Sequence, residues 1–329
     1  MKKWSIVAIA AILGLASATL GGAYAAEKLK VGFIYLGPIG DLGWTYQHDV
    51  SRKAMEQALG DKIETAYIEN VPESADAERS IEQLVRTGHK LIFATSFGYM
   101  EATLKIANKY PNVFFEHCAG YKRAKNMSTY DRRDYEGRYI SGQIAAKISK
   151  TGIIGYIVPF PIPPVISNIN AMMLGAQSVR PDIKVKPAPV VGDGGKLGVR
   201  AKPDHIGVFT ERMNAALFRD LRGRRRVGML GQDVGALIDE RLGGVGFLTR
   251  VASGMVAMSP YTNMPDDVKK MAMDTEAGIK SGKLNVFKCP ITNQDGKTVE
   301  CKGGDHLDEG QIRSMNWYVK GIDDKLPAQ

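Results

Sequence analysis

The most constraining feature of this sequence is a regular alternation of short apolar runs with longer segments of helical periodicity. The run Lys30–Leu36 is followed by a glycine-rich turn and by a predicted helix over Trp44–Leu59. A predicted strand at Ile63–Ile68 then precedes a helix over Ser74–Thr87, with Ser74 as a plausible N-cap. Repetition of strand, helix and strand predicts an α/β fold with a parallel sheet covered by helices on both faces.

The same alternation continues far enough to build two lobes. Further strands and helices are predicted at Leu91–Ala94, Tyr99–Lys109, Val113–His117, Tyr135–Lys150, Gly152–Val158 and Pro164–Val179. A length of 329 residues also favours two domains. We expect a first lobe over residues 26–130 and a second over 131–253. The C-terminal segment 254–329 is expected to return in part to the first lobe.

The N-terminus has the three parts of a secretory signal peptide. Lys2 and Lys3 precede an apolar run from Ile6 to Leu15, and small residues lead to Ala25. We expect residues 1–25 to be removed by cleavage after Ala25, which predicts a periplasmic protein. The alternative is a single anchoring helix, but the residues after the apolar run are too small and polar to complete a membrane span.

Candidate binding residues lie where predicted strands end, because ligands of open parallel sheets bind at the carboxyl edge. The loop after the first strand provides an acceptor, two flat aromatic faces and an amide in Asp41, Trp44, Tyr46 and Gln47. Such a mixture suits a planar ligand with hydrogen-bonding edges. Phe97 and Phe160 follow two other predicted strands. For all these aromatic residues the alternative is simple packing of a helix onto the sheet.

Other chemistry is not indicated by the sequence. The five histidines show no metal-ligand spacing with cysteines or carboxylates, and no nucleophile and base stand out. We therefore expect no metal, no cofactor and no catalytic residues. The cluster Arg222–Arg226 lacks interleaved aromatic residues, so it predicts a solvated face and no nucleic-acid partner. The glycine-rich stretch 192–196 lacks the spacing of a phosphate-binding loop.

A hairpin over residues 285–302 is predicted around a turn at 294–296. Pairing Asn293 with Lys297 places Cys289 opposite Cys301, which makes a disulfide plausible. The alternative is two unpaired thiols on neighbouring strands. Cys118, at the end of an apolar run, is expected to be buried and free.

Several long segments resemble one family of proteins. They are KVGFIYLGPIGDLGWTYQHD, ATSFGYM, FFEHCAGYK, NMSTYDRRDYEGRYISG, GYIVPFPIPPVISNINA, MVAMSPYTNMPDDVK and SMNWYVKGI. They are similar to the BMP, or PnrA-like, family of periplasmic substrate-binding proteins of ABC importers. The resemblance covers residues 28–186 and again 254–326.

The resemblance implies a type I periplasmic-binding-protein fold, with two doubly wound lobes joined by a hinge. It also implies a small purine nucleobase or nucleoside as ligand, an adenine-like one for this GWTYQHD loop, and an ABC permease at the inner membrane as partner. Carried over by motif position, Asp41, Trp44, Tyr46, Phe97 and Phe160 would line the cleft. Closure of the lobes over the ligand would create the shape that the permease reads.

Residues 187–250 depart from that family. Twelve of the 36 glycines fall within residues 187–252, together with the arginine cluster. Reading suitable codons of Arg241 back to Arg226 as their reverse complement yields ALIDQGADVLTQHTDS, which resembles the expected second-lobe sequence. We hypothesise an in-frame inversion of this gene segment. It predicts partial local helices within 187–250 in place of a sheet, an incomplete second lobe and weak or absent binding.

Three functions from different classes follow. The first is the solute-binding subunit of a purine importer. The second is a rearranged, non-binding remnant of such a subunit. The third is an exported enzyme acting on nucleosides, for which no catalytic constellation stands out.

Overall fold

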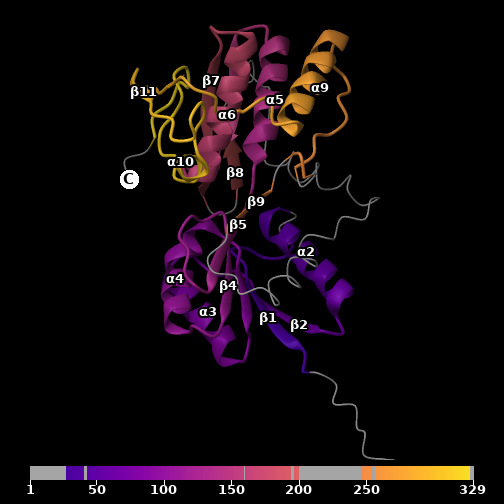
Figure 1. Ribbon diagram of the computed structural model, residues 1–329, viewed down its shortest axis with the longest axis vertical. Coiled ribbons are helices and arrows are strands. Elements are labelled where there is room, and N and C mark those ends of the chain that lie inside the picture. The colour runs from indigo at the N-terminus through magenta and orange to yellow at the C-terminus, as the bar shows by residue number, and fades with distance from the viewer. Residues whose placement is uncertain are drawn as a thin grey trace, which may run out of the picture.

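The computed structural model describes residues 27–40, 43–158, 160–193, 196–199, 246–249, 251–253 and 256–326. These residues form two lobes stacked along the long axis of the molecule (Figure 1). The predicted signal peptide lies outside the described residues, and so does most of the atypical segment, including its arginine cluster.

The first lobe is built on a parallel sheet of six strands in the order β2-β1-β3-β4-β5-β9. The strands span Leu29–Ile34 (β1), Ile63–Ile68 (β2), Leu91–Ala94 (β3), Phe114–Cys118 (β4), Met127–Arg132 (β5) and Gly246–Thr249 (β9). The predicted strands of this lobe are confirmed to within one or two residues. Two strands, β5 and β9, were not predicted.

Helices cover both faces of this sheet, as expected for strands that are apolar on both sides. Helix α2 (Trp44–Leu59) lies on one face, while α3 (Ala75–Arg86), the short η1 (Phe97–Tyr99) and α4 (Met100–Lys109) lie on the other (Figure 1). Alternate residues of β1 pack into the hydrophobic clusters on the two faces of the sheet. Phe33 packs in the cluster that contains Met55 of α2, and Ile34 packs in the cluster that contains Ile81 of α3. The Ser74 side chain accepts a hydrogen bond from Asp76 N, which confirms the predicted N-cap.

The second lobe combines two closely packed helices with a small sheet. Helix α5 (Asp134–Ile148), β6 (Ile153–Val158) and α6 (Pro163–Val179) are followed by β7 (Lys184–Asp193) and β8 (Lys196–Val199). Strands β6 and β7 are parallel, whereas β8 turns back antiparallel to β7. A Cβ atom on Gly175 of α6 would lie 2.0 Å from the Tyr139 carbonyl oxygen of α5. Glycine therefore allows the two helix backbones to touch.

The C-terminal segment packs on the second lobe. It contains α9 (Asp266–Lys280), β10 (Ile291–Thr292), β11 (Thr298–Val299) and α10 (Glu309–Arg313). Ala272, Phe287 and Tyr318 belong to the same hydrophobic cluster as Ile169 of α6. The fully buried Asn170 of α6 accepts from Val319 N at 2.9 Å and donates to Trp317 O at 2.8 Å.

The lobe boundaries differ from those expected from the sequence. Strand β9, which the prediction assigned to the second lobe, pairs with β5 in the first sheet. The described hydrophobic core of 256–326 is shared with the second lobe, although this segment was expected to return in part to the first. The reason is that β5 reads MSTYDR, which is too polar to be recognised as a strand, so the pairing that brings 246–249 back was hidden.

The predicted C-terminal hairpin has the predicted register. Ile291 pairs with Val299 and Thr292 with Thr298, and Asn293 N donates to Lys297 O at 2.9 Å. Cys289 and Cys301 are joined by a disulfide, with their Cα atoms 6.6 Å apart. Cys118 is buried and free.

Candidate functional site

The indole of Trp44 lies at the carboxyl edge of the first sheet. Trp44 opens α2, and its Nε1 donates a hydrogen bond of 2.6 Å to Thr95 O, directly after β3. The guanidinium carbon of Arg132, at the end of β5, lies 5.3 Å from the centroid of the indole ring. The His48 ring lies 4.9 Å from it on the same helix. Trp44 nevertheless remains 37% exposed, so the indole is held in a defined orientation at an accessible edge.

Arg132, which lies over the indole, is one of several charged residues at the end of β5. Arg132 Nη2 donates to Asp134 Oδ2 at 2.9 Å. Although burial lowers the pKa of Arg132, the carboxylates of Asp134 and Asp131 together outweigh that effect and hold this pKa above its ordinary value. Burial raises the pKa of Asp131 to about 6, even though Arg132 opposes the shift. Asp131 can therefore present either a protonated or an ionised carboxyl group near neutral pH.

A second aromatic group lies beyond the ends of β3 and β4. The rings of Phe97 and Tyr121 are 6.4 Å apart, and Tyr121 is exposed. The turn that carries Phe97 is fixed from both sides, because Glu73 accepts hydrogen bonds from Ser96 Oγ and Gly98 N. The half-buried Phe97 ring on this fixed turn and the exposed Tyr121 ring beside it are suited to contact with a flat ligand.

His117 supports this turn from below. Its ring is fully buried, and its Nε2 lies 2.9 Å from Ser96 O. Its Nδ1 has no hydrogen-bond partner within the part of the chain that the structure describes. Burial lowers the pKa of His117 to about 4, which outweighs the opposing effect of the Ser96 carbonyl. His117 is therefore neutral, and Nε2 is the donor.

The candidate residues from the sequence fall into three groups. Trp44, Tyr46 and Gln47 lie on the first turn of α2, where Tyr46 and Gln47 are half-buried, and Phe97 begins η1. Trp44 and Phe97 thus flank the same strand end. Phe160 follows β6 of the second lobe and is 63% exposed. Asp41 lies outside the described residues.

Sequence reasoning missed Asp131, Arg132 and Tyr121 as members of this edge. The available signal was the charged run 131–134, with two aspartates flanking two arginines between a segment of mixed polarity and a predicted helix. That run becomes interpretable only when the preceding residues are recognised as a strand, because its position at the carboxyl edge depends on β5.

Two kinds of feature are absent from the described residues. No group of three or more histidine, cysteine, aspartate or glutamate side chains is arranged to hold a metal ion in the described ranges. Within the same ranges, no helix combines the length and apolarity needed to cross a membrane.

Comparison with known proteins identifies the family. The family model for PnrA-like ABC transporter substrate-binding proteins (Bmp) matches residues 28–190. A purine-binding protein of Brucella abortus is 48% identical over 93% of this chain and 96% of its own length. An ABC transporter nucleoside-binding protein of Lactococcus lactis is 30% identical over 34% of this chain and 32% of its own.

The fold agrees with that of a solved structure. A solute-binding protein of an ABC transporter system from Aeropyrum pernix superposes with a TM-score of 0.58 at 17% identity, over 89% of this chain and all of that one. The extent of the Brucella match and the type I binding-protein fold lead to one conclusion. This chain belongs to the PnrA-like (Bmp) family of ABC transporter substrate-binding proteins.

Proposed function

We propose that this protein binds a purine nucleobase or nucleoside at the carboxyl edge of its first lobe and delivers it to an ABC permease. The observation that carries the proposal is the orientation of Trp44, which its bond to Thr95 O holds at an accessible edge beside Arg132. The name of the Brucella relative, a purine-binding protein, agrees with this chemistry.

Each part of the edge matches one property of a purine. The Phe97 and Tyr121 rings offer apolar faces for the flat ring system, and stacking of this kind contributes about 1–3 kcal/mol per base in other proteins. Asp131 offers a carboxyl group whose pKa of about 6 allows it to donate or accept at the polar edge of the base. A site that hydrogen-bonds the polar edge of the base discriminates against ligands that lack such an edge.

The N-terminal signal supports delivery from outside the inner membrane. Its lysine pair, apolar run and small residues before the predicted cleavage site are those of an exported protein. We place the mature protein in the periplasm, beginning at Ala26. N-terminal sequencing of the protein recovered from a periplasmic extract tests this placement, and an intact Met1 there would contradict it.

Isothermal titration calorimetry tests the ligand assignment. Adenine and adenosine should bind the purified mature protein with Kd in the micromolar range or below. Tyr121→Ala should weaken binding about tenfold, because it removes one exposed ring from the edge. The matched control is Phe114→Ala, since Phe114 is 47% exposed at the opposite, amino end of β4. Equal losses in both variants would show that the ligand does not bind at this edge.

A second candidate function is that of a rearranged remnant that no longer binds. It is favoured by the end of the family-model match at residue 190, close to the start of the atypical segment. The antiparallel β8 also departs from a doubly wound lobe. Sequencing of the coding DNA tests it: the reverse complement over residues 187–250 should encode a second-lobe sequence of this family. Tight binding in the calorimeter would exclude loss of function.

A further inference from the structure

Arg313 crosses from one lobe to the other. It lies on α10 of the C-terminal segment, which packs on the second lobe, and its side chain is 6% exposed. Its Nη1 donates to Gly120 O at 3.1 Å and to Thr129 Oγ1 at 3.0 Å. Gly120 follows β4 and Thr129 lies in β5, so both acceptors belong to the first lobe. Two acceptors on one guanidinium nitrogen make this a geometrically specific contact.

The charge of Arg313 is balanced on its own helix. Arg313 Nε lies 2.9 Å from Glu309 Oε1, one helical turn earlier. The same carboxylate lies 3.9 Å from guanidinium nitrogens of Arg123 and Arg133, both beside the first sheet. Helix α10 thus directs a cation at first-lobe oxygens and a carboxylate at Arg123 of the first lobe and at Arg133, which joins β5 to α5. This complementarity in both directions favours a single docking position of the two lobes.

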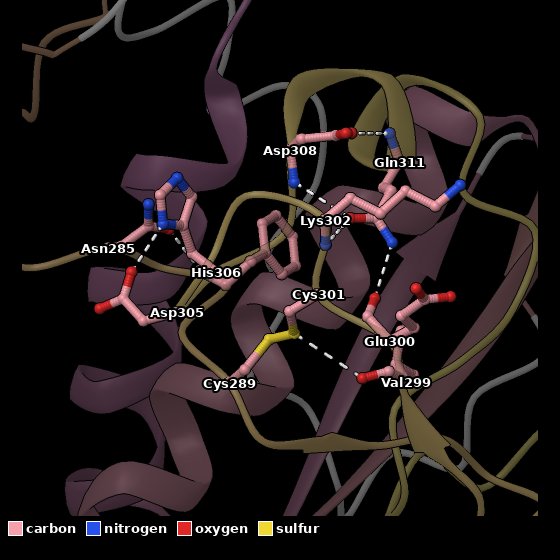
Figure 2. The surroundings of a disulfide bond; sticks show 11 residues. Asn285, Cys289, Val299, Glu300, Cys301, Lys302, Asp305, His306, Asp308 and Gln311 are labelled. Carbon is pink, nitrogen blue, oxygen red and sulfur yellow. Dashed lines mark hydrogen bonds and ion pairs between the residues drawn. A yellow bond between two sulfur atoms is a disulfide. The ribbon is translucent and has the colours of Figure 1, made fainter.

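A helix of five residues does not hold such a position unaided. Its support comes from Gln311, which completes a capping box with Asp308. The Gln311 side chain also accepts from Lys302 N at 2.9 Å and donates to Glu300 O at 2.7 Å. Glu300 and Lys302 flank Cys301, which is bonded to Cys289 (Figure 2). A continuous set of bonds therefore runs from the disulfide through Gln311 to the helix that carries Arg313.

We propose that Arg313 is an interlobe clasp and that the Cys289–Cys301 disulfide holds the clasp in place. The disulfide fixes the main chain at residues 300–302, this main chain fixes Gln311, and Gln311 fixes the direction in which Arg313 leaves α10. The clasp sets how firmly the second lobe is docked against the β4–β5 end of the first lobe. It does not depend on the identity of the ligand.

Amide hydrogen exchange on the whole mature protein tests the clasp. In Arg313→Ala, exchange of the peptide covering residues 119–130 should increase at least tenfold, although the changed residue is in the other lobe. The double variant Cys289→Ser/Cys301→Ser should increase exchange of the same peptide. Combining all three substitutions should add little to the effect of Arg313→Ala alone, because the disulfide acts through Arg313.

The matched control is Arg180→Ala. Arg180 Nη1 also donates to a backbone carbonyl, Ser149 O at 2.7 Å, but within the second lobe. This variant should leave exchange at 119–130 unchanged. The proposal is overturned if Arg313→Ala behaves like the control, or if the cysteine variant increases exchange equally with and without Arg313. If Arg313→Ala does not fold, the test uses Arg313→Lys and the cysteine variant in its place. The clasp is refuted if the peptide 119–130 exchanges at the wild-type rate in both of these variants.

Discussion

Acid should destabilise this protein through His117, and the effect can be isolated by one substitution. The His117 ring is fully buried, its Nε2 donates to Ser96 O, and burial lowers its pKa from 6.5 to about 4. A proton added to Nδ1 has no acceptor among the described residues. The folded state therefore binds this proton less readily than the unfolded chain does.

The sign and size follow from the two pKa values. Above pH 6.5 the imidazole is neutral in both states, so its contribution to the free energy of unfolding is fully present. Between pH 6.5 and about 4 only the unfolded chain binds the proton, so stability is lost as the pH falls. The two values differ by about 2.5, and each pKa unit corresponds to about 1.4 kcal/mol, so the total loss is about 3 kcal/mol.

Asp131 acts in the opposite direction over an overlapping range. Burial raises its pKa from 3.8 to about 6, so the folded state binds that proton more readily and gains stability as the pH falls from 6 to 3.8. The wild-type profile alone therefore conceals the contribution of His117. Both proteins contain Asp131, so its contribution cancels when the free energy of unfolding of His117→Asn is subtracted from that of the wild type.

Urea unfolding followed by tryptophan fluorescence at pH 7.5, 6.5, 5.5 and 4.5 measures this difference. Asparagine retains a donor for Ser96 O but leaves a small void, so at pH 7.5 the variant should be less stable by about 1–2 kcal/mol. The difference should reverse by pH 4.5, because the wild type has by then lost most of the total of about 3 kcal/mol, which exceeds its advantage at pH 7.5. His306→Asn, at the protein surface, controls for the exchange of residue type. The reasoning would be refuted if the free energies of unfolding of wild type and His117→Asn changed by the same amount between pH 7.5 and 4.5.

Two further substitutions test the packing of the second lobe. Gly175→Ala should lower the free energy of unfolding by about 3 kcal/mol, because the new Cβ would meet Tyr139 O at 2.0 Å and push α5 from α6; an unchanged thermal midpoint would contradict this. Asn170→Ala should cost about 2–3 kcal/mol, because it leaves Trp317 O and Val319 N buried without a partner. Limited proteolysis should then release the C-terminal segment first, and wild-type resistance would argue against this role.

Local sequence pattern was sufficient to predict most of the helices and strands. Strands β2 and β3 and helix α2 have the predicted bounds, because apolar runs and helical periodicity are properties of neighbouring residues. The hairpin register followed in the same way from a short turn. Strand β5 was missed because its residues are mostly polar, and it exists through pairing with β4 and β9.

The candidate site, too, was predicted from the sequence only in part. The sequence by itself determined the fold class, the family and the placement of Trp44 and Phe97 near strand ends. Only the tertiary structure decided that Arg132 lies over the indole of Trp44 and that Arg313 reaches Thr129 in the other lobe. These contacts join residues that are distant in sequence, and their geometry is set by strand order and lobe docking, which no local pattern encodes.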